Sequence, residues 1–160
     1  MSWFEDIRIG DVYMTGRHVF TADDIKAFAR RFDPQAFHVD EAAAAQSHFG
    51  ALCASGWHTA IAWMRLMLDS RRLEAEAAEA RGERAGQYGP ALGMRDLRWL
   101  KPVYAGDTLD YRSEIVEMRV SNSRPRVGLI TIRTTGTNQK GEVAISWVST
   151  TFLERRAGQP

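Results

Sequence analysis

The sequence predicts an α+β domain in which a long antiparallel sheet wraps around one central buried helix. The helix is expected to begin at Gly56, because the stretch that follows, WHTAIAWMRLML, is apolar on nearly every side, as in helices buried on several sides. From Ala91 to Arg155, apolar residues recur with a period of two, which is typical of long strands. One buried helix followed by a run of such strands favours this arrangement.

The first part of the chain is expected to supply a short strand and two smaller helices. The strand should run from Val12 to Phe20. Thr21 is a good N-cap for a helix whose i, i+3, i+4, i+7 apolar stripe consists of Ile25, Phe28, Ala29 and Phe32. Asp33-Pro34 should end this helix, because proline pushes the preceding residue out of the helical region. A short alanine-rich helix should follow from Asp40 to about Gln46.

The second part of the chain supplies the end of the central helix and the sheet. Residues 69–84 interleave Glu and Arg, which predicts that this extension of the helix lies in solvent. The alternation in the strands predicts two buried sets, namely Leu109, Tyr111, Ser113 and Ile115 on one strand and Val143, Ile145 and Trp147 on another. Residues 138–141 end in glycine and indicate a hairpin turn, and a second reversal is expected near residues 121–125.

Size and charge limit the possible functions. A chain of 160 residues can bury one substantial core, so residues 1–160 are expected to form a single domain. The net charge of +1 gives no basis for binding nucleic acid or an anionic membrane. The most apolar stretch contains Arg65 and is too short to span a bilayer. The acidic N-terminus does not resemble a signal peptide, and the lone Cys53 suits a reducing compartment, so a cytoplasmic protein is expected.

The segment from Phe32 to Asp40 contains the densest group of candidate catalytic residues. Asp33 and His38 are separated by a helix-breaking proline, which lets a loop bring carboxylate and imidazole to one point. Together they could hold one water molecule, with the carboxylate accepting its proton and the imidazole ordering it or exchanging a proton with substrate. The alternative is structural: Asp33 would end a helix and His38 would be an ordinary loop histidine.

The start of the central helix is a second candidate site. The N–H groups at a helix N-terminus are unpaired and carry partial positive charge, and Gly56 leaves the backbone open to a ligand. A thioester carbonyl that gains negative charge could be stabilised there. The alternative is that Ser55 merely caps the helix and that Gly56 allows close packing.

These segments together resemble the MaoC-like family of (R)-specific enoyl-CoA hydratases, which have the hot-dog fold. The family pattern Asp-x-Asn-Pro-x-His-x-Asp is matched by Asp33, His38 and Asp40, and residues 54–56 resemble the start of the family's central helix. Residues 98–107, RWLKPVYAGD, resemble the family's segment that leads into the long strands. The matches extend over roughly residues 10–155 in the family's order.

The resemblance implies a function and a set of site residues. Asp33 and His38 would be the hydratase dyad, and the Gly56 N–H would bind the thioester oxygen. Further contacts to an acyl-CoA substrate are expected from Ser55, Trp57, Arg95 and Lys101. The substrate would be a trans-2-enoyl-CoA or, in reverse, an (R)-3-hydroxyacyl-CoA. No metal and no cofactor besides the coenzyme A thioester are expected, His48 and His58 are interpreted as structural, and the protein would form a homodimer or a dimer of dimers.

The chain departs from the family pattern at several positions near the dyad. Gln35 replaces an Asn, Ala36 replaces a Pro, and Ser55 replaces a His. Relatives also carry a hydroxyl on the central helix beside the catalytic Asp, whereas this helix offers Ile61, Trp63 and Met64. Two alternatives therefore stay open, a hot-dog acyl-CoA thioesterase and a non-catalytic module that binds acyl thioesters. The thioesterase alternative is disfavoured because the central helix has no carboxylate before Asp69.

Overall fold

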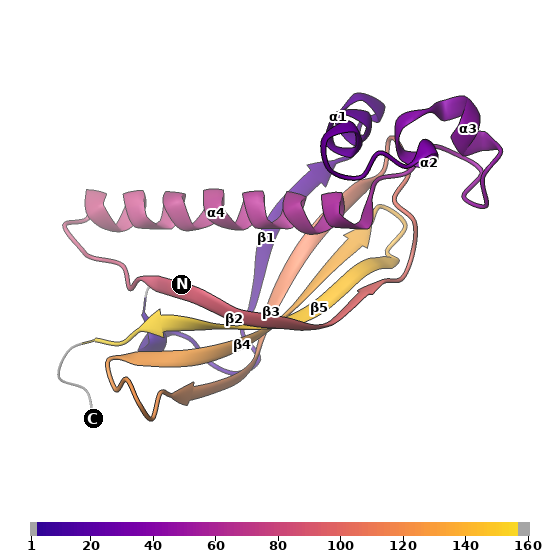
Figure 1. Cartoon of the computed structure of the whole chain (residues 1–160). Helices are drawn as coiled ribbons and strands as arrows, with labels where there is room; N and C mark the ends of the chain where they lie inside the picture. The colour runs from indigo at the N-terminus through magenta and orange to yellow at the C-terminus, as the bar shows by residue number, and fades with distance from the viewer. Residues whose placement is uncertain (1–2, 157–160) are drawn as a thin grey trace.

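The computed structural model describes residues 3–156 and contains one antiparallel sheet (Figure 1). Its strands occur in the order β1-β3-β4-β5-β2, so the first two strands of the chain lie at the two edges. The bounds are β1 Val12–Val19, β2 Tyr88–Trp99, β3 Thr108–Val120, β4 Val127–Asn138 and β5 Val143–Glu154. The sheet predicted from the alternating pattern is therefore confirmed, and it extends to β1 near the N-terminus.

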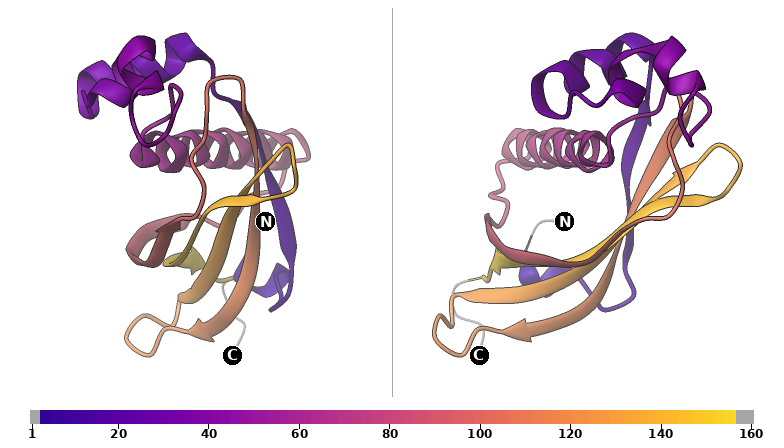
Figure 2. Two further views of the ribbon diagram at one scale, coloured as in Figure 1. Left: turned by 90° about the vertical axis from the view of Figure 1, so that its right-hand side faces the viewer. Right: turned by 45° about the vertical axis from the view of Figure 1, so that its right-hand side comes forward.

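The helices are arranged as one long element and one cluster. Helix α4 (Gly56–Ala80) lies along the concave face of the curved sheet. The short helices gather over one end of the sheet, beside the N-terminus of α4 (Figure 2). They are α1 (Ala22–Phe32), α2 (Ala36–Val39) and α3 (Glu41–Ala45), and a single 3-10 turn, η1 (Phe4–Asp6), precedes β1. This is the predicted arrangement of a sheet wrapped around a central helix.

The predicted boundaries of α1 and α3 are confirmed by their caps. The hydroxyl of Thr21 accepts a hydrogen bond from the backbone N–H of Asp24, and α1 ends just before Asp33. Asp40 caps α3 by accepting from the N–H of Ala43. The helical turn α2 differs from the expected loop, because the chain after Pro34 forms one turn before it extends again. His38 lies within that turn.

One face of α4 differs from the expectation of a helix buried on several sides. Thr59 and Ala62 face the sheet and are buried. The opposite face carries an exposed apolar stripe, formed by Trp57, Ile61, Met64 and Leu68, which are between 39% and 57% exposed. The prediction was wrong for this face of the single chain, because a pattern of apolar residues does not show which element covers them.

The sheet buries the predicted strand faces and anchors the first turns of α4. Leu109, Tyr111 and Ile115 are fully buried, and so are Ile145 and nearly all of Trp147, whereas Val143 at the start of β5 is 37% exposed. The hydroxyl of Tyr111 donates to the backbone carbonyl of Thr59 over 2.6 Å. This bond fixes the start of α4 against β3. Within residues 3–156, no helix combines the length and apolar character needed to cross a membrane.

Candidate active site

Asp33 lies where α1 ends, and two hydrogen-bond donors hold its carboxylate. The Ser55 hydroxyl donates to Oδ2 over 2.7 Å, and the Gln35 side-chain amide donates to Oδ1 over 2.8 Å. Burial raises the pKa of this carboxyl, but the two hydrogen bonds and the nearby His38 outweigh burial and hold the pKa below its usual value. Asp33 is therefore ionised at neutral pH.

His38 lies in α2, and its side chain is only 6% exposed. Its Nδ1 is 2.7 Å from the backbone carbonyl oxygen of Cys53. Because a carbonyl oxygen can only accept a hydrogen bond, Nδ1 carries a proton, and in the neutral form of the ring Nε2 is the nitrogen with a free lone pair. That Nε2 faces Asp33.

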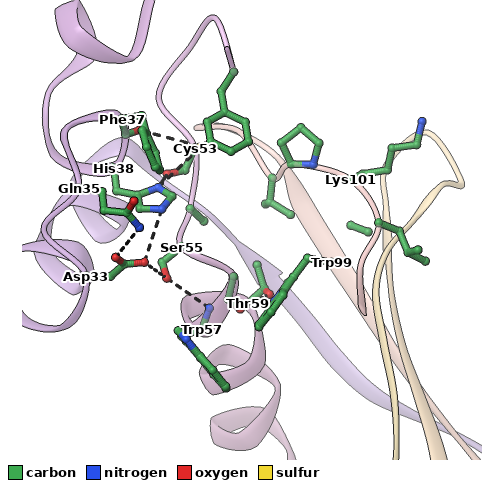
Figure 3. A pocket seen from close by; sticks show the side chains of 17 residues that line it. Asp33, Gln35, Phe37, His38, Cys53, Ser55, Trp57, Thr59, Trp99 and Lys101 are labelled. Carbon is green, nitrogen blue, oxygen red and sulfur yellow. Dashed lines mark hydrogen bonds and ion pairs between the residues drawn. The ribbon is translucent and has the colours of Figure 1, made fainter. Parts of the chain in front are cut away.

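The gap between Asp33 and His38 has the width for one bridging water molecule. Nε2 and Oδ2 are 3.6 Å apart, which is longer than a direct hydrogen bond. An oxygen atom about 2.8 Å from both would complete two bonds of ordinary length. Both groups are acceptors, so this water would donate its two protons to them and keep its lone pairs for another atom. Figure 3 shows the two side chains pointing toward one another beside the pocket.

Ser55 and Gly56 bring the N-terminus of α4 next to Asp33. The Ser55 hydroxyl caps the helix by accepting from the N–H of Trp57 over 3.3 Å while it donates to Asp33. Gly56 is the first helical residue, so its N–H has no partner carbonyl within the helix and lies at the positive end of the helix dipole. A donor placed there can stabilise negative charge on a ligand oxygen.

A pocket of about 440 Å³ lies beside these groups. Its apolar walls consist mainly of Phe37, Phe49, Trp57, Trp99, Leu100, Pro102 and Val103. The indole ring of Trp99 packs directly on Gly56, where a Cβ atom would lie 2.5 Å from the ring. Trp57 meets Trp99 edge to face, with ring centroids 5.3 Å apart. Glycine at position 56 is therefore what allows Trp99 to form this wall.

The pocket brings together most of the predicted site residues, with one exception. Asp33, His38, Ser55, Gly56, Trp57 and Lys101 all line it (Figure 3). Lys101 also forms an ion pair with Glu142, with Nζ 3.2 Å from Oε1. Arg95 lies elsewhere on β2, where it pairs with Asp96 at 3.2 Å. Within the single chain, Arg95 does not belong to this pocket, because its strand carries it toward a separate hollow.

A second cavity, of about 620 Å³, lies further along α4. It extends between the helix and the strands β1 and β2, and its walls include Met14, Met64, Met67, Met94 and Ile132. Thr59 lines the first pocket, and Trp63, one helical turn further on the same face, lines the second. Trp63 packs edge to face on Trp147, with centroids 4.9 Å apart. Trp63 therefore lines the second cavity one helical turn away from Thr59, a wall residue of the first pocket.

The sequence interpretation missed three groups at this site. The sequence names Gln35 only as a departure from the family pattern, although a side-chain amide two residues after Asp33 indicates a hydrogen-bond donor for its carboxylate. Trp99 is not among the expected residues, and only its long-range packing on Gly56 reveals it. The carbonyl of Cys53 orients His38 through the backbone, so no side-chain pattern could indicate it.

The fold and this site define a hot-dog domain with a carboxylate–imidazole pair beside the N-terminus of its central helix. Residues 7–138 match the family model of the MaoC-like domain. Because this match covers most of the chain, the protein belongs to the MaoC-like family, as the sequence predicts. Membership indicates hydratase or dehydratase chemistry.

Comparison with known proteins adds three relatives of different kinds. The MaoC-like dehydratase structure from Rhodospirillum rubrum has a TM-score of 0.79 and 34% identity, covering 96% of this chain and 97% of that one. YdeM of Bacillus subtilis, an uncharacterized protein, is 29% identical over 140 residues, which are 85% of this chain and 87% of that one. A mesaconyl-CoA hydratase from Cereibacter sphaeroides is 40% identical over 65 residues, 41% of this chain and only 19% of that enzyme.

Proposed function

We propose that this protein adds water to a trans-2-enoyl-CoA, or removes it from an (R)-3-hydroxyacyl-CoA, with Asp33 and His38 as the catalytic dyad. The observation that carries the proposal is the 3.6 Å separation between Asp33 Oδ2 and His38 Nε2. Both atoms can accept hydrogen bonds. Both residues line the pocket, which also contains Gly56 at the N-terminus of α4. This arrangement suits a water molecule that attacks the double bond of an enoyl thioester, which is polarised by conjugation with the thioester carbonyl.

The hydration step follows from these positions. The water oxygen forms a bond to the β carbon while one of its protons passes to the dyad, and the double-bond electrons move toward the thioester oxygen. The Gly56 N–H stabilises the negative charge on that oxygen. The dyad then delivers a proton to the α carbon, which restores the carbonyl and returns Asp33 and His38 to their starting state. Dehydration is the same path reversed.

The substrate assignment rests on the pocket and on relatives. The apolar walls favour an acyl group, and Ser55, Trp57 and Lys101 line the pocket where the thioester would lie. The similarity to a mesaconyl-CoA hydratase over part of the chain supports a coenzyme A thioester. The proton transfers described need no cofactor besides that thioester. The proposal also includes a contact between Arg95 and coenzyme A in the assembled oligomer. In the single chain, Arg95 lies outside the pocket.

The proposed functional form is a homodimer or a dimer of dimers. Besides the exposed stripe of α4, from Trp57 to Leu68, the edge strand β2 carries exposed apolar side chains, of which Leu92 is 56% and Met94 47% exposed. Met94 lines the same cavity as Met64 of the stripe. An apolar face of this kind beside an unpaired strand edge suits a second copy of the chain. Since Trp57 belongs both to the stripe and to the pocket, the partner would also close the pocket.

The deciding experiment measures loss of the enoyl-thioester absorbance with crotonyl-CoA and with longer and branched analogues. Wild type should turn over at least one of them, and Asp33→Asn and His38→Ala should each lose at least about 100-fold in kcat. Asp23→Asn and His48→Ala are matched controls, because both residues are exposed and lie outside the pocket.

The remaining outcomes distinguish the alternatives. Release of free thiol without hydration would indicate a thioesterase. Tight binding of the analogues without turnover would indicate a binding module. Full hydratase activity in Asp33→Asn would overturn the assigned dyad while leaving the fold assignment intact.

A further inference from the structure

Three side chains from separate elements converge at a point outside the pocket. His18 comes from the end of β1, Asp24 from the first turns of α1 and His58 from the start of α4. Asp24 Oδ2 is 3.0 Å from His18 Nε2 and 3.6 Å from His58 Nε2. One ligand atom from each of the three residues lies within 4.8 Å of the others. The reaction proposed above uses none of these residues.

His58 is anomalous as a buried polar side chain. It is 5% exposed, its Nδ1 has no hydrogen-bond partner among residues 3–156, and its Nε2 is 3.6 Å from Asp24, beyond hydrogen-bond length. The ring stacks on Phe28 with centroids 4.5 Å apart and planes 4° from parallel. The unpartnered Nδ1 points away from the cluster; the nitrogen that faces Asp24 is Nε2, and its 3.6 Å separation from the carboxylate oxygen leaves room for an ion bound to both.

We propose that His18, Asp24 and His58 form a binding site for a divalent transition-metal ion of the zinc type. In tetrahedral zinc sites the bonds to nitrogen and oxygen are about 2.0–2.2 Å, which places neighbouring ligand atoms about 3.3 Å apart. The two distances to Asp24 Oδ2, 3.0 and 3.6 Å, bracket that value. Two imidazoles with one carboxylate favour such an ion over Mg²⁺ or Ca²⁺, which prefer oxygen ligands.

The surroundings suit this ion. The Asp24 side chain is 46% exposed, which gives the ion a route from solvent. Phe20 and Phe28 pack on the His58 ring and limit its movement. The bound ion would join β1, α1 and α4, the last two of which carry Asp33 and Gly56 at their ends.

Calorimetric titration of chelator-treated, tag-free full-length protein with ZnCl₂ tests the site. Wild type should bind one Zn²⁺ per chain, and Asp24→Asn and His18→Ala should each weaken binding at least about tenfold. Co²⁺ should give the intense visible absorption of a four-coordinate ion in wild type but not in Asp24→Asn. Zn²⁺ should also raise the Tm of wild type, because it binds only the folded chain.

Two controls locate the ion. Asp23→Asn alters the neighbouring exposed aspartate and should keep wild-type affinity. Asp33→Asn should also keep it, which excludes binding at the catalytic pair. The proposal is overturned if wild type shows no saturable one-to-one binding, or if Asp24→Asn binds as tightly as wild type. Circular dichroism of each variant confirms that a loss of binding is not a loss of fold.

Discussion

The carboxylate of Asp33 accepts a 2.7 Å hydrogen bond from the hydroxyl of Ser55, a residue 22 positions further along the chain. The same oxygen atom, Oδ2, faces His38. Ser55 thus connects the start of α4 to the proposed dyad. Its two hydrogen bonds make it a positioning residue for Asp33, in addition to the substrate contact expected from the sequence.

Ser55→Ala should weaken catalysis by removing a bond that positions Asp33, and it should also raise the pKa of that carboxyl. The hydroxyl stabilises the ionised carboxylate, so its removal raises the pKa of Asp33 toward the usual value. Because the proposed mechanism uses the ionised form, the acidic limb of the kcat/KM profile should move to higher pH. Near neutral pH Asp33 is ionised in both proteins, and kcat/KM should fall roughly tenfold because the carboxylate has lost a bond that positions it. A profile that kept the wild-type acidic limb would contradict this role. Ser55→Gly preserves most of the capping stability and should show the same shift.

Gly56→Ala should lower activity through the wall of the pocket. The added methyl group would lie 2.5 Å from the Trp99 ring, so the indole must move away or the helix start must shift. Either change alters the position of the N–H donor, and kcat should fall by about 10- to 100-fold. Gly82→Ala, where a Cβ would meet no atom within 4 Å, controls for strain alone, because Gly82 has a positive φ of 69°. Wild-type kcat in Gly56→Ala would contradict the assigned donor.

Trp63→Phe should shift the preferred acyl length. Trp63 lines the 620 Å³ cavity one turn of α4 from Thr59, which lines the 440 Å³ pocket, so a smaller ring at position 63 should give a longer chain more room to extend along α4. The ratio of kcat/KM for an eight-carbon enoyl-CoA to that for crotonyl-CoA should rise about tenfold, as expected for a few methylene groups newly buried. Trp3→Phe, a matched change at a residue that lines neither space, should leave this ratio close to wild type. An unchanged ratio in Trp63→Phe would show that the acyl chain takes another path.

Cys53 should resist alkylation in the folded protein. The side chain is 1% exposed, and burial raises the pKa of the thiol to about 11. At pH 8 the thiolate fraction is therefore about 100-fold lower than in the unfolded chain, whose thiol has a pKa of about 8.5–9. Iodoacetamide should label the native protein at pH 8 at least about 100-fold more slowly than the protein in concentrated urea. Comparable rates would mean that the segment around Cys53 opens readily.

Much of the fold was predictable because its signals are local. The cap at Thr21, the proline after Asp33 and the alternation in residues 109–115 each depend on neighbours in the chain. Their boundaries agree with the structure to within a residue or two. The exposed stripe on α4 was not predictable from pattern, because coverage of a helix face depends on what packs there and not on which residues it carries.

In the candidate site, too, the local features were predictable and the long-range contacts were not. Residue types gave Asp33, His38 and Gly56, and the structure brings these three to one pocket. The contacts that tune them cross long stretches of chain: Ser55 reaches Asp33, and Trp99 packs on Gly56 from β2. Such contacts depend on the tertiary arrangement and leave no spacing in the sequence. The convergence of His18, Asp24 and His58 was missed for the same reason.

The hydrogen bond from His38 Nδ1 to the Cys53 carbonyl has a consequence for how the site tolerates mutation. The Cys53 sulfur also lies 3.7 Å from Nδ1, but the shorter bond, of 2.7 Å, goes to a main-chain acceptor that stays in place when the side chain at position 53 changes. Only a shift of the segment that holds this carbonyl, through the Ala54 N–H bonded to Val103 and the bridge from Cys53 to Tyr104, would disturb it. The main chain thus holds the proton on Nδ1, so small replacements at position 53 should keep it on that nitrogen.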